Sequence, residues 1–337
     1  MGTEGPAYRR DPLSGRWVVV APGRSLRPDD FASSPAEEGR EESGRCPFCP
    51  GNEADTPPEI FALRDPGDDR DGPGWTVRVV PNKYPAVSRT GAAEGRSGTL
   101  FESRAGVGDH EVVIDGPDHS LEFPDLPPAR RRDVLETYRE RVRRLDAEPG
   151  TVYVQLFKNK GREAGATLRH PHTQIVSLPL LPKAVRDEVE SSARHGRERG
   201  ECLHCRLGEE ESKAGERLVL ENSSFRAFVP FAARFPYEVR ILPRTHAARF
   251  SLTGDTAVAS LAETLGFVLG RLKTALRDPA YDLVLHQGPV SGAGRTEFVH
   301  WYLEVIPVTT RVAGFEWGTG FHINPVLPEA AAARLRI

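Results

Sequence analysis

The four cysteines of the chain form two C-x-x-C pairs, Cys46/Cys49 and Cys202/Cys205. Thiols of a cytosolic protein rarely form disulfides, so a doubled spacing of this kind indicates zinc binding. A thioredoxin-like redox pair is the alternative. The dipeptide between the first two cysteines lies in a Gly/Pro-rich stretch, with no following helix pattern that would lower a thiol pKa. The chain is therefore expected to fold around two metal-bound loops.

The sequence after the first cysteine pair is repeated in outline after the second. Glu111 begins an apolar, strand-like run, and His119 lies eight residues after it. Glu238 begins a similar run in the second half, and His246 again lies eight residues later. This shared register makes the two histidines equivalent, and it predicts a duplicated fold.

Each half continues with an amphipathic helix, near residues 127–147 and 254–277, and then a strand. A Gly-containing loop follows, and then a second strand that begins with His170 or His300. The late histidine lies 51 residues after the early one in the first half and 54 in the second. The agreement in element order supports two halves, which we place at residues 1–195 and 196–337.

Each half thus offers two thiolates and two imidazoles, which complete a tetrahedral zinc shell without an open position. Such closed sites are structural, so we predict two structural zinc ions per chain. The predicted ligands are Cys46, Cys49, His119 and His170 in the first half, and Cys202, Cys205, His246 and His300 in the second. Competing ligands are His110 for the first site, and His204 or His286 for the second.

The composition excludes some classes of protein. The formal net charge of -3 does not indicate a nucleic-acid-binding protein. No signal peptide is visible, and no apolar run approaches the length needed to span a bilayer. A cytoplasmic protein without nucleic-acid or membrane partners is expected.

The halves differ at one informative place: His170-x-His172 in the first corresponds to His300-x-Tyr302 in the second. Residues two apart on a strand share a face, so His172 lies beside the zinc ligand, with Gln174 next along that face. A neutral imidazole can carry a nucleotidyl group as a phosphoramidate. An amide can donate to a phosphate oxygen. We predict His172 as nucleophile and Gln174 as its catalytic partner, the alternative being a purely structural histidine.

A loop with two glycines precedes the His172 strand, between Phe157 and Thr167. It also contains Asn, Lys and Arg, a composition that suits phosphate binding. Such a loop is weak evidence alone, and its value lies in its position just before the predicted nucleophile.

These motifs resemble those of the galactose-1-phosphate uridylyltransferases and their close relatives in the histidine-triad superfamily. The resemblance covers nearly the whole chain. Its most specific segments are Arg10–Val18, Arg24-x-x-Arg27-Pro28, Cys46–Glu53, Val80–Pro85, Pro117–Ser120, Asn159–Gly161, His170–Gln174 and Ala313–Glu316. It implies an α+β fold of two tandem histidine-triad-like halves, each an antiparallel sheet with flanking helices. It also implies ping-pong transfer of a nucleotidyl group from a nucleoside-diphosphate sugar to the histidine and then to a second phosphate acceptor.

The resemblance also implies roles for substrate-binding residues. Asn82 and Lys83 would lie at the ribose and phosphates, with Arg24 and Arg27 nearby. The α- and β-phosphates would be held by Asn159, Gly165, Ala166 and Thr167, and the hexose hydroxyls by Glu316. The partners would be a nucleotide sugar and a sugar 1-phosphate or phosphate, and a homodimer is expected by analogy.

Three departures bear on the substrate. The second Cys/Cys/His/His set is intact, as in the ADP-glucose phosphorylase branch, position 173 is Thr, and the C-terminal segment matches only at Ala313–Glu316. The main hypothesis is a UDP-glucose:hexose-1-phosphate uridylyltransferase. The second is a phosphorylase or adenylyltransferase that uses ADP-glucose or a diadenosine polyphosphate. The third is a non-catalytic, zinc-stapled nucleotide-binding protein.

Overall fold

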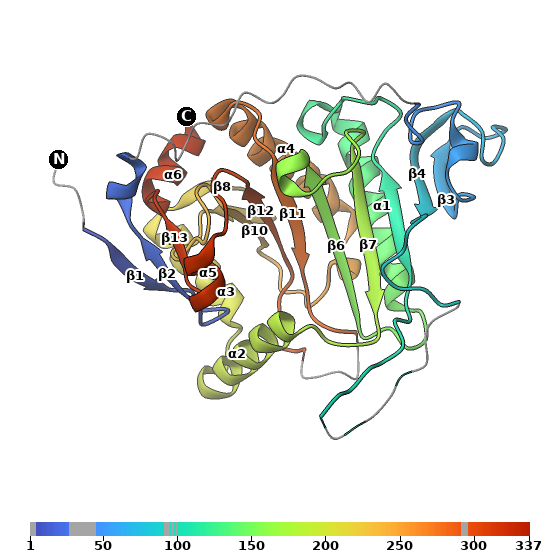
Figure 1. Ribbon diagram of the computed structural model, residues 1–337. Coiled ribbons are helices and arrows are strands. Elements are labelled where there is room, and N and C mark those ends of the chain that lie inside the picture. The colour runs from blue at the N-terminus through green and yellow to red at the C-terminus, as the bar shows by residue number, and fades with distance from the viewer. Residues whose placement is uncertain (1–4, 27–44, 91–94, 96–97, 99, 291–295) are drawn as a thin grey trace.

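The computed structural model describes residues 5–26, 45–90, 95, 98, 100–290 and 296–337. Its centre is a ten-stranded sheet of order β3-β4-β5-β7-β6-β11-β12-β10-β9-β8, in which every neighbouring pair is antiparallel (Figure 1). The first-half strands are β3 (Phe61–Arg64), β4 (Trp75–Pro81), β5 (His110–Ile114), β6 (Tyr153–Lys160) and β7 (His172–Leu178). The second-half strands are β8 (Leu218–Glu221), β9 (Phe225–Phe228), β10 (Val239–Pro243), β11 (Tyr281–His286) and β12 (Tyr302–Pro307).

A second sheet brings the two ends of the described chain together. Its strands are β1 (Ala7–Arg10), β2 (Trp17–Val20) and β13 (His322–Asn324). β1 pairs with β2 antiparallel, and β13 pairs with β2 parallel. The helices of the described residues are α1 (Pro128–Asp146), α2 (Lys183–Arg199), α3 (Leu203–Ala214), α4 (Asp255–Leu276), α5 (Gly314–Thr319) and α6 (Pro328–Arg336). Short 3-10 turns are η1 (Pro22–Leu26), η2 (Glu53–Asp55), η3 (Phe123–Asp125), η4 (Arg162–Ala164) and η5 (Phe250–Leu252).

The strand order shows the internal duplication directly. From each edge to the centre of the sheet, the five strands of one half follow the same order as the matching five of the other half. The two half-sheets join at the β6–β11 pair. There Phe157 pairs with Val284 and Asn159 with Asp282, which is a symmetric register. The predicted α+β fold with antiparallel sheets is confirmed, and the two half-sheets join into one. The boundary at residues 195/196 falls inside α2, and the division into two domains stays a prediction.

The strand pairing differs by one residue from the register read in the sequence. Gln174 pairs with Val112 in the first half, whereas Glu304 pairs with Arg240 in the second. The eight-residue register would instead have placed Val239 opposite Glu304. The connection from strand to histidine is therefore one residue shorter in the second half.

Helices α1 and α4 pack against one another, and each has a buried apolar stripe, as the sequence predicts. The hydroxyl groups of Tyr138 on α1 and Thr173 on β7 are hydrogen-bonded to each other, with 2.5 Å between the two oxygens. Thr173 therefore faces the helices. Because side chains alternate along a strand, His172 and Gln174 face the opposite side of the sheet. None of the described helices is long and apolar enough to cross a membrane.

Arg139 offers a test of how the halves are held together. Its buried guanidinium on α1 donates to the Thr253 carbonyl at 2.8 Å and to Asp255 at 2.7 Å, both at the start of α4. Arg139→Ala should lower the free energy of unfolding by about 1–3 kcal/mol, because it leaves a buried carbonyl unpaired. The exposed Arg132–Glu136 pair on the same helix is the control, and Arg132→Ala should leave stability close to that of the unmodified chain. Urea unfolding of both variants measures this, and equal effects would contradict it.

Candidate active site and metal groups

The four predicted ligands of the first half lie together. One ligand atom from each of Cys46, Cys49, His119 and His170 falls within 4.8 Å of the others. Cys49 Sγ lies 3.4 Å from His119 Nδ1 and 3.6 Å from His170 Nδ1, and Cys46 Sγ lies 3.9 Å from His170 Nδ1. A tetrahedral zinc ion with ordinary bond lengths places sulfur and nitrogen ligands about 3.6 Å apart. The residues present therefore fit a zinc ion.

The surroundings of this group favour metal binding as well. His170 Nε2 donates to the Gly116 carbonyl at 2.8 Å, which leaves Nδ1 unprotonated and aimed at the thiols. Burial lowers the pKa of His170 to about 4 and, together with the nearby Cys46 thiol, raises the pKa of Cys49 to about 11. A bound cation would favour the thiolate form. Among the competing ligands, His110 does not belong to this group.

The second half brings only three of its four predicted ligands together. Cys202, Cys205 and His246 form a group within 4.8 Å. The ring of His300 lies beside it, with its centroid 5.1 Å from that of His246. Its Nδ1 is 2.9 Å from the Trp301 carbonyl, and its buried Nε2 has no hydrogen-bond partner. The group could hold a metal ion, and the place of His300 in its shell stays a prediction, as does the number of ions per chain.

His172 begins β7, two residues after the predicted ligand His170, so the strand starts two residues later than the sequence predicts. Its Nδ1 lies 2.8 Å from the His170 carbonyl, which accepts a hydrogen bond only if Nδ1 carries the proton. The lone pair is therefore on Nε2. Burial lowers the pKa of His172, which favours the neutral imidazole. The arrangement can provide a neutral, oriented nitrogen nucleophile on the face of the sheet away from α1 and α4.

Phe48, inside the first C-x-x-C pair, packs edge-on against both histidine rings. Its ring centroid lies 5.3 Å from that of His172 and 6.1 Å from that of His170. It belongs to an apolar cluster with Cys46, Trp75, Val80, Val112 and Ile114. In the sequence, the position of Phe48 between Cys46 and Cys49 is the signal that places it close to the residues around this group. The loop that holds the metal ligands thus also fixes the ring of His172.

Gln174 lies on β7 two residues after His172, so the two side chains share a face of the sheet. Its side chain is hydrogen-bonded to a residue of the neighbouring strand β5. His110 Nε2 lies 2.8 Å from Gln174 Oε1, and Asn82 Nδ2 donates to the same oxygen at 3.4 Å. The predicted substrate residue Asn82 is therefore adjacent to Gln174. Lys83 follows it, with an exposed side chain whose Nζ donates to the Asp55 carbonyl at 3.4 Å.

The predicted phosphate-binding loop makes a tight turn between β6 and β7. Gly161 and Gly165 have φ of +87° and +89°, a conformation that glycine adopts without strain. The Ala166 amide donates back to the Gly161 carbonyl at 3.1 Å. Asn159, on β6, lies close to Gly165, since a Cβ at Gly165 would be 3.5 Å from its Nδ2. Thr167 is exposed after the turn.

Two predicted substrate residues lie in another part of the molecule. Arg24 is on η1, beside the β1-β2-β13 sheet, and Glu316 is on α5. Figure 1 shows both elements separated from β7. The carboxylate of Glu316 accepts a hydrogen bond from the Ala313 amide at 3.0 Å. Arg27 lies outside the described residues.

A buried ion pair that the sequence did not predict lies on the side of β7 that faces α1. Lys158 of β6 is 2.8 Å from Asp115 and 3.3 Å from Glu122. Burial disfavours the ammonium, but these carboxylates outweigh it and raise the pKa of Lys158. Lys158 and Asn159 are neighbours on β6, and neighbouring side chains on a strand point to opposite faces. Because Asn159 was expected to face the substrate, a strand in this segment would have placed Lys158 on the face toward α1 and α4.

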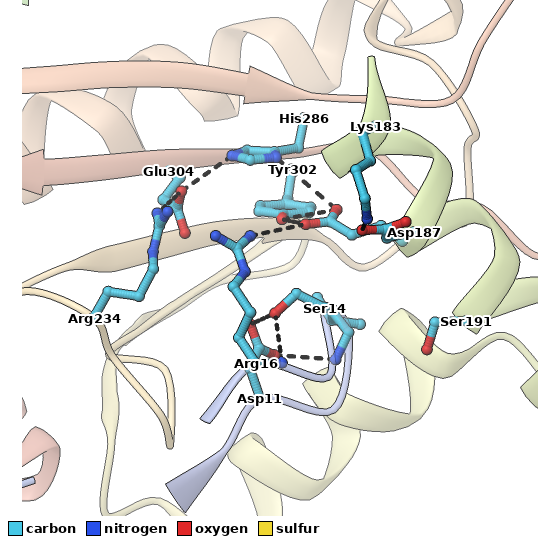
Figure 2. Close-up of polar contacts among 12 residues, drawn as sticks. Asp11, Ser14, Arg16, Lys183, Asp187, Ser191, Arg234, His286, Tyr302 and Glu304 are labelled. Carbon is cyan, nitrogen blue, oxygen red and sulfur yellow. Dashed lines mark hydrogen bonds and ion pairs between the residues drawn. The ribbon is translucent and has the colours of Figure 1, made fainter. Parts of the chain in front are cut away.

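In the second half, the corresponding positions form a self-contained polar cluster (Figure 2). His286 stacks on Tyr302 with 4.4 Å between ring centroids, and its Nε2 is 3.1 Å from Glu304. Arg234 pairs with Glu304 at 2.6 Å, and Glu188 accepts from the Tyr302 hydroxyl at 3.2 Å. Every side chain here has a protein partner, so this half presents no free nucleophile in the place of His172.

Comparison with known proteins agrees with this geometry. A family model described as "Galactose-1-phosphate uridyl transferase, N-terminal domain" matches residues 3–182. ADP-glucose phosphorylase of Arabidopsis thaliana is 35% identical, with 99% of this chain and 93% of that protein covered. Galactose-1-phosphate uridylyltransferase of Thermotoga maritima is 29% identical, with 97% of each covered. The crystal structure of the Arabidopsis phosphorylase with bound ADP-glucose has a TM-score of 0.82 and 33% identity, with 98% of this chain and 99% of that chain covered.

The chain belongs to the galactose-1-phosphate uridyl transferase family. The resemblance read from the sequence is confirmed, and with it the general class of enzyme, a nucleotidyltransferase. The roles of individual site residues stay predictions.

Removal of one cysteine tests the first metal group. Cys46→Ser should lower the zinc content by about one ion per chain and lower the melting temperature, because a closed site contributes folding energy. Metal analysis and thermal unfolding measure both. Cys205→Ser is the matched variant for the second group. Full stability of Cys46→Ser with complete loss of activity would argue against a structural role.

Phe48→Leu tests the contact with His172 while keeping an apolar side chain in the cluster. Edge-to-face contacts contribute about 0.5–1.5 kcal/mol each, so the modification rate of His172 by a nucleotide sugar should fall up to about tenfold. Zinc content and melting temperature should stay close to those of the unmodified chain. An unchanged rate would show that Phe48 does not orient the ring.

Proposed function

We propose that this protein transfers a nucleotidyl group from a nucleoside-diphosphate sugar to a second phosphate-containing acceptor, through a covalent intermediate on His172. The observation that carries the proposal is the hydrogen bond from His172 Nδ1 to the His170 carbonyl. It fixes the tautomer and the direction of Nε2 on the open face of the sheet, beside Gln174.

In the first half-reaction, the Nε2 lone pair attacks the α-phosphorus and forms an N–P bond. The bond from phosphorus to the oxygen that bridges the two phosphates breaks, and the sugar 1-phosphate leaves with the electron pair. The imidazole becomes cationic, and its Nδ1–H stays bonded to the His170 carbonyl, which stabilises that charge. No proton has to move in this step.

In the second half-reaction, a phosphate oxygen of the acceptor attacks the same phosphorus. The N–P bond breaks, its electron pair returns to Nε2, and neutral His172 is regenerated. Gln174 donates to a non-bridging oxygen in both steps, and Asn82, Lys83, Asn159 and the Gly165–Thr167 turn bind the remaining phosphates and the ribose.

Zinc at the cysteine–histidine groups would be structural. The first group has four protein ligands and no open position, so the metal would not contact the substrate. Its contribution is to hold His170 and Phe48, and through them His172.

The main candidate reaction is UDP-glucose:hexose-1-phosphate uridylyl transfer, with galactose 1-phosphate as acceptor, as the names of the uridylyltransferase relatives indicate. A second candidate is phosphorolysis of ADP-glucose. It is favoured by the 35% identity to the Arabidopsis phosphorylase over nearly the whole chain.

A homodimer, expected by analogy, is part of the proposal. Arg24 and Glu316 lie away from β7 within one chain, and a second copy would bring them to the substrate. A cytoplasmic location stays a prediction.

Labelling separates these candidates. The protein is incubated without acceptor with UDP-glucose or ADP-glucose, each radiolabelled at the α-phosphate. Acid-labile, base-stable label on the protein is expected with the true donor, because phosphoramidates of histidine have this stability. His172→Asn should abolish the label. Undiminished label in that variant, or no label with either donor, would contradict the proposed mechanism.

A further inference from the structure

His110 has two hydrogen-bonding contacts that together determine its protonation. It begins β5, where it pairs with Val176, diagonal to Gln174 on the neighbouring strand. The backbone amide of Ala86 lies 3.1 Å from His110 Nδ1, and Gln174 Oε1 lies 2.8 Å from His110 Nε2. A backbone N–H can only donate, so Nδ1 must be the unprotonated nitrogen. The proton of the neutral ring is therefore on Nε2, and it is donated to Gln174.

Asn82 is fixed in the same way. Its Oδ1 accepts the Tyr84 backbone amide at 2.8 Å, so its Nδ2 is turned toward Gln174 Oε1 at 3.4 Å. The 3.1 Å approach between Asn82 Nδ2 and His110 Nε2 joins two donors. The two nitrogens come this close because both donate to the same oxygen, Gln174 Oε1.

The oxygen of Gln174 thus receives two donors, and the amide cannot rotate by 180° without setting its NH₂ against both of them. Its nitrogen is left as a donor, and it has no hydrogen-bond partner among the described residues. A rotated amide would present its oxygen to an anionic phosphate. The correct orientation matters because a preorganised donor stabilises developing negative charge, whereas an acceptor repels it.

We propose that His110 is a positioning residue that holds the Gln174 amide with its NH₂ toward the transferred phosphoryl group. This inference rests on the proposed nucleotidyl transfer through His172. Burial lowers the pKa of His110, although the hydrogen bond to Gln174 opposes this, so the ring stays neutral with a single proton. His110 acts through Gln174 and does not contact the substrate.

The second half supports the assignment by contrast. In the strand register, Glu238 and Glu304 occupy the places of His110 and Gln174. Burial and the neighbouring Glu304 carboxylate raise the pKa of Glu238 to about 7, although Arg234 opposes this. Glu304 is instead paired with Arg234 and His286, and a carboxylate at the place of Gln174 would repel a phosphate. Only the first half offers an amide donor.

The test combines two variants in a cycle. In His110→Phe, the rate of single-turnover labelling of His172 should fall by about ten- to a hundredfold, less than the loss expected for removing the donor itself. The apparent KM for the donor should change by less than about threefold, since the ground state is bound mainly by other groups. His110→Gln should recover part of the rate, because its amide can donate to Gln174. His195→Phe, on α2 in contact with Glu201, is the control and should leave the rate unchanged.

The decisive comparison is made in the Gln174→Ala background. There His110→Phe should lower the rate by less than about twofold further, because two residues that act as one unit are not additive. An equal fall in both backgrounds would overturn the positioning role and leave a general structural one.

An observation independent of activity accompanies it. In protein labelled with ¹⁵N at histidine, the signal that disappears in His110→Phe should show a protonated Nε2 and an unprotonated Nδ1 at pH 7. The opposite tautomer would overturn the inference even in an active enzyme. Absence of labelling in the unmodified protein would count against the proposed function, and the tautomer would still decide the role of His110.

Discussion

The hydrogen bond between His172 Nδ1 and the His170 carbonyl is the interaction on which the site depends. It joins the predicted metal ligand His170 to the predicted nucleophile His172, so the group of thiols and imidazoles bears on where Nε2 lies. Phe48 restrains the same ring from the side. Nucleophilic attack on phosphorus requires an unprotonated nitrogen in line with the bond that breaks, so the orientation and tautomer of the histidine matter as well as its presence.

The duplication gives the two halves different tasks on one continuous sheet. The first half keeps an imidazole and an amide with free donor and acceptor atoms on the open face. The second half fills the same positions with Tyr302, Glu304 and His286, whose polar atoms are paired among themselves and with Arg234 (Figure 2). The second half therefore completes the sheet, and its α5 carries Glu316, which is proposed to meet the substrate of a second copy.

Much of the fold could be predicted, because periodicity and repeats are local. The two helix stripes, the strand before each histidine and the first four-ligand group are all as expected. The joining of the half-sheets at β6 and β11, and the one-residue change of register at Arg240, could not be predicted, since strand pairing is set by contacts between distant segments. Likewise, the sequence could not show that His300 Nδ1 contacts the Trp301 carbonyl, and its role as a ligand stays a prediction.

The sequence by itself determined which chemical groups are present. It indicated which residues can bind metal, which histidine is not needed as a metal ligand, and which family the motifs resemble. Only the tertiary structure decided how these atoms are oriented. His110 was a rival zinc ligand by spacing, but strand pairing places it against Gln174, and the Ala86 amide fixes its proton. Hydrogen-bond direction depends on which donors and acceptors meet in space, and residues 64 positions apart in the chain meet only when the sheet has formed.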